Sequence, residues 1–286
     1  MPDALWSYDV NLSMLFTEVP LLERPAAARD AGFEAVEFWW PFATATPADV
    51  EVDRFVDALG EAGVRLVGLN FFAGDLAAGD RGLVSWPERT REFLDSVDVA
   101  VAIGVRTGCR TFNALYGNRL PGVDPGRQDD IAIEALAHAA HQAARIDAQV
   151  VIEPLSGVPL YPLRKAADAL AVIDRLPRRD NLRLLADLYH LAVNGDDLST
   201  LHQLTQRIGH LQIADAPGRH EPGTGELDLV GVVERLVAHG YRGHIGLEYA
   251  PSTTTLDSLA WLPVSGIPAR HSSPRQRRAL PLKEAQ

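Results

Sequence analysis

Short apolar runs alternate with longer amphipathic segments along most of the chain. Each run is rich in Val, Ile, Leu and Ala, a pattern typical of parallel strands that helices cover on their outer face. Eight runs predict strands, at Val10–Phe16, Ala35–Phe38, Arg65–Asn70, Arg110–Asn113, Gln149–Glu153, Arg183–Asp187, Ile208–Asp215 and His244–Tyr249.

The segments between these runs repeat apolar residues at the spacing of a helix. In the clearest one, Thr46 is the expected N-cap, Pro47 takes the first helical position and Gly63 follows the end. In the next one, Gly104 is expected to end the helix. Helices are predicted at Leu21–Ala31, Pro47–Ala62, Pro87–Ile103, Arg127–Ile146, Leu163–Leu176, Asp197–Arg207, Asp228–His239 and Thr253–Trp261.

This alternation predicts the fold class. Strands joined by crossover helices form a parallel sheet, and eight such units within residues 1–262 fit a single (β/α)8 TIM barrel. A doubly wound open sheet is the alternative, but no glycine-rich dinucleotide fingerprint follows the first strand. Residues 263–286 are polar and basic without an apolar period, so we expect a disordered tail.

The composition narrows the classes of function. Hydrophobic residues make up 47% of the 286 residues, enough for a globular core, and the formal net charge is −11. That charge disfavours a nucleic-acid partner, because phosphate backbones are bound by clustered Lys and Arg. No run reaches the roughly 18 apolar residues of a membrane span, and the first residues lack the pattern of a signal peptide. With Cys109 as the single cysteine, these features predict a cytoplasmic protein.

The most distinctive stretch is His210–Glu226, HLQIADAPGRHEPGTGE. It changes from an apolar strand to a loop that is stiffened by Pro and Gly and carries Arg219. A polar loop directly after a strand is where a rigid scaffold displays reactive groups. An ordinary solvated loop is the alternative interpretation.

Polar side chains end seven of the predicted strands. They are Glu37, Asn70, Asn113, Glu153, Asp187, Gln212 and Glu248. Any one of them could be an ordinary hydrogen-bonded residue. In a barrel, however, the carboxyl ends of all strands meet at one mouth, where the active sites of this fold lie. The seven together therefore predict a site.

Three of these residues bring negative charge to the mouth, namely Glu153, Asp187 and Glu248, and Gln212 adds a neutral carbonyl oxygen. Their mutual repulsion would force protonation unless a cation lay between them. Oxygen ligands favour a hard divalent ion, which predicts Mg²⁺ or Mn²⁺. His190 can reach the same cavity, although a histidine at the start of a helix is also a common structural feature.

Several segments carry a family resemblance. Ile152–Pro154 (IEP), Asp187–His190 (DLYH), His210–Glu226 and Gly246–Tyr249 (GLEY) are similar to the hydroxypyruvate isomerase family, which belongs to the xylose-isomerase-like barrels. Gly79–Leu83 (GDRGL) and two N-terminal segments resemble it as well, so the match spans nearly all of residues 8–262.

The resemblance implies a role for most of the strand-end residues. The implied metal ligands are Glu153, Asp187, Gln212 and Glu248. Glu153 and Glu248 are also the implied acid/base pair, and His190 and Arg219 face the substrate. The remaining strand-end residues are expected on the substrate side as well, namely Glu37, Asn70 and Asn113.

The expected function is isomerisation of a small hydroxy-carbonyl acid, with hydroxypyruvate to tartronate semialdehyde as the first candidate. Arg219 would pair with the substrate carboxylate. Leu155–Gly157 and the loop NALYGN depart from the family pattern, so 2-oxotetronate or another short sugar acid or sugar stays open. The net charge disfavours a barrel endonuclease, and the two glutamates disfavour a non-catalytic sugar-binding barrel. Homo-oligomer formation is left open.

Overall fold

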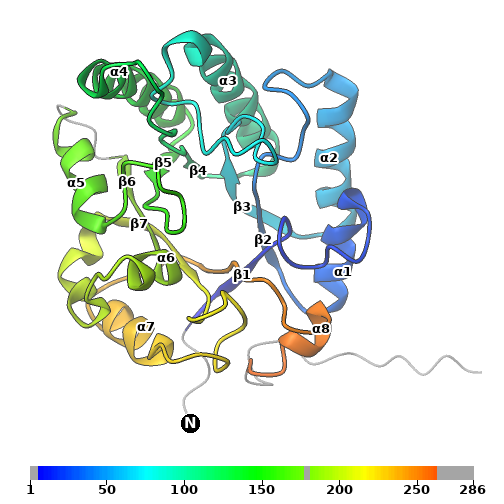
Figure 1. Ribbon diagram of the computed structural model, residues 1–286. Helices are drawn as coiled ribbons and strands as arrows, with labels where there is room; N and C mark the ends of the chain where they lie inside the picture. The colour runs from blue at the N-terminus through cyan, green and yellow to red at the C-terminus, as the bar shows by residue number, and fades with distance from the viewer. Residues whose placement is uncertain (1–5, 177–180, 263–286) are drawn as a thin grey trace, which may run out of the picture.

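Eight parallel strands close into a barrel in the computed structural model, which describes residues 6–176 and 181–262 (Figure 1). The strands pair in chain order, and β1 closes the barrel by pairing with β8. Their bounds are β1 Tyr8–Asn11, β2 Ala35–Phe38, β3 Arg65–Asn70, β4 Thr111–Asn113, β5 Gln149–Ile152, β6 Leu182–Asp187, β7 Ile208–Ile213 and β8 Ile245–Leu247. The TIM-barrel prediction is confirmed.

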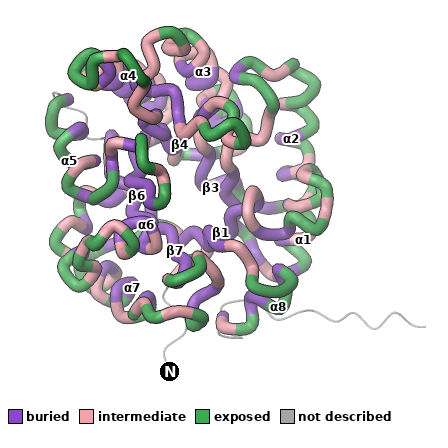
Figure 2. Tube along the Cα trace, in the orientation of Figure 1, coloured by how far each residue is buried: buried purple, intermediate pink, exposed green. Residues whose placement is uncertain are grey.

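Helices surround the barrel, with buried residues on the side facing the strands and exposed residues outside (Figure 2). The α-helices are α1 Arg24–Asp30, α2 Asp49–Ala62, α3 Thr90–Thr107, α4 Pro125–Ala144, α5 Ala166–Asp174, α6 Leu188–Val193, α7 Leu229–Ala238 and α8 Thr255–Ser258. The 3-10 helices are η1 Leu21–Glu23, η2 Pro87–Arg89 and η3 Leu198–Arg207. Among the described helices, none is long and apolar enough to cross a membrane.

Some predicted boundaries were wrong, each for a local reason. The first strand ends at Asn11 instead of Phe16, because the apolar residues that follow are buried in a loop rather than paired in the sheet. The N-cap of α2 is Ala48 rather than Thr46. Gly104 lies inside α3, where a Cβ would approach the Phe112 ring to 2.8 Å, and the helix ends instead at Gly108 with a positive φ.

The barrel interior is polar where β7, β8, β1 and β2 meet. Glu37 of β2 reaches His210 and Gln212 of β7 although these strands are not neighbours, so the side chains cross the inside of the barrel. Two glycines provide the space. A Cβ at Gly246 would lie 2.8 Å from Glu37 Oε1, and one at Gly68 would lie 3.0 Å from Glu37 Oε2.

The domain bounds predicted for the barrel, residues 1–262, stay a prediction. The tail prediction, residues 263–286, lies outside the described residues.

Candidate active site

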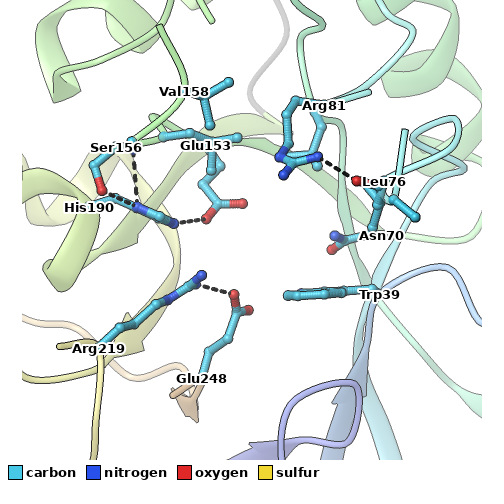
Figure 3. Close-up of a pocket in the computed structure, with 14 residues that line it drawn as sticks. Trp39, Asn70, Leu76, Arg81, Glu153, Ser156, Val158, His190, Arg219 and Glu248 are labelled. Atoms are coloured by element: carbon cyan, nitrogen blue, oxygen red, sulfur yellow. Dashed lines mark hydrogen bonds and ion pairs between the residues drawn. The ribbon is translucent and has the colours of Figure 1, made fainter. Parts of the chain in front are cut away.

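A cavity of about 470 Å³ opens at the carboxyl ends of the strands (Figure 3). Five of the predicted site residues line it, namely Asn70, Glu153, His190, Arg219 and Glu248. Four others do not line it: Glu37, Asn113, Asp187 and Gln212. These four are buried and contact residues of the first group or each other, so the structure brings the predicted set together in two layers.

Glu153 and His190 of the cavity wall lie close to the buried Asp187, and we call these three residues the mouth cluster. Their ligand atoms all lie within 4.8 Å of one another. The backbone N–H of Ser156 donates to His190 Nδ1 at 3.1 Å, which fixes Nδ1 as an acceptor and leaves the proton of the neutral ring on Nε2. His190 Nε2 lies 3.6 Å from Asp187 Oδ2 and 3.9 Å from Glu153 Oε1. Burial lowers the pKa of His190 to about 4, so the ring is neutral at physiological pH.

Arg219 bridges two carboxylates at this wall. Its Nη2 lies 2.5 Å from Glu248 Oε1 and 3.2 Å from Asp187 Oδ2. The loop that carries Arg219 is held by the buried carboxylate of Asp215, which accepts hydrogen bonds from backbone N–H groups, including that of Gly223 at 2.8 Å. The loop predicted after β7 is therefore a rigid mount for Arg219.

The two glutamates at the cavity differ in the hydrogen bonds that their carboxylates accept. Glu248 accepts from three groups, Asn11 Nδ2 at 2.8 Å, Gln212 Nε2 at 2.6 Å and Arg219. Glu153 accepts one close hydrogen bond, from Asn113 Nδ2 at 2.8 Å. Burial, followed by the charges of Glu248 and Asp187, raises the pKa of Glu153 well above its ordinary value. Burial raises the pKa of Glu248 only to about 7, since the charge of Arg219 opposes it.

Comparisons with known proteins place this chain in a family. The model of the xylose isomerase-like TIM barrel family matches residues 25–263. A Streptomyces coelicolor protein named "Putative hydroxypyruvate isomerase" is 48% identical over 92% of this chain and 98% of its own length. The chain belongs to the hydroxypyruvate isomerase family.

Other relatives show the breadth of this family. A 2-oxo-tetronate isomerase of Pectobacterium atrosepticum is 34% identical over 89% of this chain and 95% of its own length. A crystal structure described as an AP endonuclease, family 2, from Brucella melitensis superposes with a TM-score of 0.81 at 35% identity, covering 89% of this chain and 97% of that one. The relatives named isomerases therefore include more than one substrate.

The buried polar residues at the strand ends fit a hard divalent cation. Both hydrogens of the Gln212 amide are used, because Nε2 donates to Glu37 Oε1 and to Glu248 Oε2. Its Oε1 is buried and has no hydrogen-bond partner among the described residues. A bare amide oxygen beside buried carboxylates is a donor set that suits Mg²⁺ or Mn²⁺.

A second group lies deeper in the barrel and consists of Asp9, Glu37 and His210, which we call the interior cluster. The distances among these three side chains would also allow them to bind a cation, since their ligand atoms lie within 4.8 Å of one another. His210 Nε2 lies 2.7 Å from Glu37 Oε2, however, and each satisfies the charge of the other. Glu37 also accepts from Asn11 and Gln212. Glu37 is therefore better placed to hold the amides of Asn11 and Gln212 than to contact the substrate, which is the role predicted for it.

Several residues of the site were not predicted from the sequence. Asn11, at the end of β1, donates to both Glu37 and Glu248. Trp39 and Arg81 line the cavity. The signal for Asn11 was present, because it is a polar residue at a strand end, but the strand was predicted to continue past it.

Proposed function

We propose that this chain is a metal-dependent isomerase that interconverts a small hydroxy-keto acid and its aldehyde isomer through an enediolate. One observation carries the proposal: Glu153 and Glu248, which follow β5 and β8, face one cavity from separate strands. Two carboxylates placed in this way can each serve one of two adjacent substrate carbons, as a 1,2-isomerisation requires.

The glutamates move the proton. One takes the proton from the carbon next to the carbonyl, and the other gives its own proton to the former carbonyl carbon. The hydroxyl proton passes to the former carbonyl oxygen, and proton exchange with solvent resets the two carboxyl groups. The donor pattern supports a division of roles, because the three hydrogen bonds to Glu248 favour its carboxylate form as the base. Glu153 accepts fewer hydrogen bonds, which suits the group that delivers the proton.

The oxygens that gain charge in the enediolate require donors. His190 offers Nε2–H from a neutral ring, because Ser156 N–H occupies Nδ1. Arg219 offers a guanidinium on the same wall. Fixed donors of this kind stabilise developing charge without reorganisation during the reaction.

Glu153, Asp187, Gln212 and Glu248 would hold the metal, with Mg²⁺ or Mn²⁺ as the candidates. When bound, a divalent ion supplies Lewis acidity that polarises the substrate carbonyl. The unpartnered Oε1 of Gln212 supports this ligand set.

Hydroxypyruvate is the first candidate substrate, after the names of the relatives at 48% and 34% identity. A 2-oxotetronate would use the same residues, and a relative of that name is also 34% identical. The endonuclease description of the Brucella structure is not carried over, because a chain of net charge −11 lacks the excess of Lys and Arg that a phosphate backbone requires.

Isomerisation of a substrate panel in heavy water tests this function. The panel holds three-, four- and five-carbon hydroxy-carbonyl acids and the matching free sugars, each with Mg²⁺, Mn²⁺ or a chelator. We expect metal-dependent turnover of an acid, with solvent deuterium in the product. Full turnover under chelation would contradict the metal assignment. Product without deuterium at slow turnover would indicate a hydride shift and contradict the acid/base roles.

A further inference from the structure

The cavity is lined by two arginines, and Arg219 is already neutralised. Its Nη2 contacts both Asp187 and Glu248, and its guanidinium carbon lies 5.6 Å from the Tyr189 ring centroid. A substrate carboxylate placed on Arg219 would share the guanidinium with two anions. Arg219 is therefore a poor sole binding group for that carboxylate.

Arg81 is in the opposite situation. In the part of the chain that the structure describes, no carboxylate lies within ion-pair distance of its guanidinium. Only Nη1 makes hydrogen bonds, to the carbonyl oxygens of Leu76 at 2.9 Å and Asp80 at 2.6 Å. Nε and Nη2 donate to no described residue. A guanidinium that lines a cavity with two free nitrogens can bind a planar carboxylate.

The loop around Arg81 holds it in place. The carboxylate of Asp80, its neighbour in sequence, is occupied by Arg89 at 2.8 Å and by the backbone N–H of Asp75. The Arg81 carbonyl accepts from the backbone N–H of Gly117 at 3.0 Å. Gly82 has a φ of +103°, and a Cβ there would lie 1.9 Å from the Leu115 carbonyl oxygen. The guanidinium is thus positioned before any ligand arrives.

Figure 3 shows Arg81 and Arg219 on opposite sides of the cavity, with Glu153 and Glu248 between them. Near Arg81 the wall is formed by neutral residues, including Asn70 and Leu76. The acidic residues that line the cavity are the two glutamates alone among the described residues. A hydroxy acid can therefore place its carboxylate on Arg81 and its reacting carbons at the glutamates.

We propose that Arg81 binds the carboxylate of the substrate and makes this site selective for acids over neutral sugars. This assignment rests on the proposed function, and it replaces the pairing of Arg219 with that carboxylate. Arg219 then remains with the carboxylates of its own wall.

The test compares an acid with a neutral molecule of the same skeleton. Turnover of hydroxypyruvate and of dihydroxyacetone is measured for wild type, Arg81→Gln, Arg81→Lys and Arg91→Gln. Arg91 is a matched control, because its side chain is 85% exposed and, among the described residues, forms an ion pair with Asp95 alone. We expect Arg81→Gln to raise KM for hydroxypyruvate about 10–100-fold, the usual range for a lost charged hydrogen bond. The KM of Arg81→Lys for hydroxypyruvate should lie between those of wild type and Arg81→Gln. The KM of Arg91→Gln should match that of wild type.

The second arm needs no turnover. Binding of glycerate and of glycerol is measured calorimetrically under chelation, so that neither the metal nor the reaction contributes. Glycerate should bind more tightly than glycerol to wild type and lose this preference in Arg81→Gln. If no acid is isomerised while this preference holds, the proposed function fails and Arg81 still binds acids.

Three outcomes would overturn the assignment. One is turnover of hydroxypyruvate with an unchanged KM in Arg81→Gln. Another is an equal loss for dihydroxyacetone and hydroxypyruvate, which would show that Arg81 only supports the loop. The third is wild type that neither isomerises hydroxypyruvate nor prefers glycerate to glycerol.

Discussion

The mouth cluster and the interior cluster contain the same three residue types, one Asp, one Glu and one His, yet their histidines differ in charge. His210 of the interior cluster is hydrogen-bonded to Glu37 at 2.7 Å. Burial alone would lower its pKa, but the charge and hydrogen bond of Glu37, together with the charges of Asp9 and Glu248, outweigh burial and raise the pKa to about 9. His190 of the mouth cluster accepts a hydrogen bond from the Ser156 backbone, and burial lowers its pKa to about 4.

The difference shows that the hydrogen-bond partners of the ring nitrogens determine what a buried His–carboxylate group does. A carboxylate in direct contact yields a closed ion pair, which holds its neighbours in place. A backbone N–H on Nδ1 yields a neutral ring with its Nε2–H directed at ligands or substrate. The interior cluster is thus suited to holding neighbouring side chains in place, and the mouth cluster is suited to contacting a ligand or substrate.

The sharpest way to test this contrast is to neutralise the glutamates at the cavity. Glu153→Gln and Glu248→Gln should each lower kcat by about 10²–10⁴-fold, the usual contribution of a general acid or base. Unfolding free energy measured under chelation should change little for Glu153→Gln, because burial already favours the uncharged form of this side chain. A large loss of stability with retained turnover would assign Glu153 to support instead.

Neutralising the interior cluster should have the reverse effect. Glu37→Gln and His210→Gln should each lower the free energy of unfolding by about 3–5 kcal/mol, because each leaves a buried partner without its counter-charge. The double variant should lose less than the sum of the two. Glu34→Gln is the control, since its ion pair with Arg29 is exposed and should contribute less than about 1 kcal/mol. Denaturant titration measures all four, and additive losses would contradict the pairing.

The two histidines should also act in separate pH ranges. The raised pKa of His210 means that the folded state retains a proton that the unfolded state releases. Its stabilisation is therefore complete below pH 6.5 and is lost as pH rises through 9, on the order of 3 kcal/mol. The lowered pKa of His190 acts in the opposite direction, so stability is lost as pH falls from 6.5 towards 4.

Thermal unfolding across pH 4–10 measures both effects. His210→Gln should remove the alkaline loss and leave the acid side unchanged. An alkaline loss of the same size in His210→Gln would contradict the assignment of that proton.

The smallest expected effect concerns Asp9. Both of its carboxylate oxygens lack a hydrogen-bond partner among the described residues, and burial followed by the charge of Glu37 raises its pKa well above the ordinary value. Above pH 3.8 folding therefore carries a requirement for proton uptake by Asp9, and stability is lost as pH rises. Asp9→Asn removes that requirement and should stabilise the protein by about 1 kcal/mol at pH 8. A loss of stability would show that the Asp9 carboxyl group makes a needed contact.

The sequence predicted the fold well because the strands are apolar runs of the right length. A predicted strand boundary was wrong where residues are buried without being paired in the sheet. Leu12 and Leu15 are buried in a loop, so the first strand was predicted to end too late. Of the residues that line the cavity, Asn70, Glu153 and Glu248 were found by the rule of strand ends, and His190 and Arg219 from the segments that follow β6 and β7. The hydrogen-bond partners behind these residues were not found. The His210–Glu37 contact, for example, joins residues 173 positions apart, and no period in the sequence indicates it.

Arg81 illustrates a second limit of the sequence. It lies in a long loop whose shape depends on backbone hydrogen bonds and positive-φ glycines, and not on an apolar period. The segment GDRGL contributed to the family resemblance, but its residues could not be sorted into those that face the cavity and those that hold the loop.

The two glycines beside Glu37 restrict the order in which this barrel can accept substitutions. Alanine at Gly246 would place a methyl group 2.8 Å from Glu37 Oε1, and alanine at Gly68 would lie 3.0 Å from Glu37 Oε2. Either change requires the Glu37 side chain to move, which its hydrogen bonds to His210 and Gln212 oppose. The effect of a substitution at any one of these three positions is therefore expected to depend on the residues at the other two.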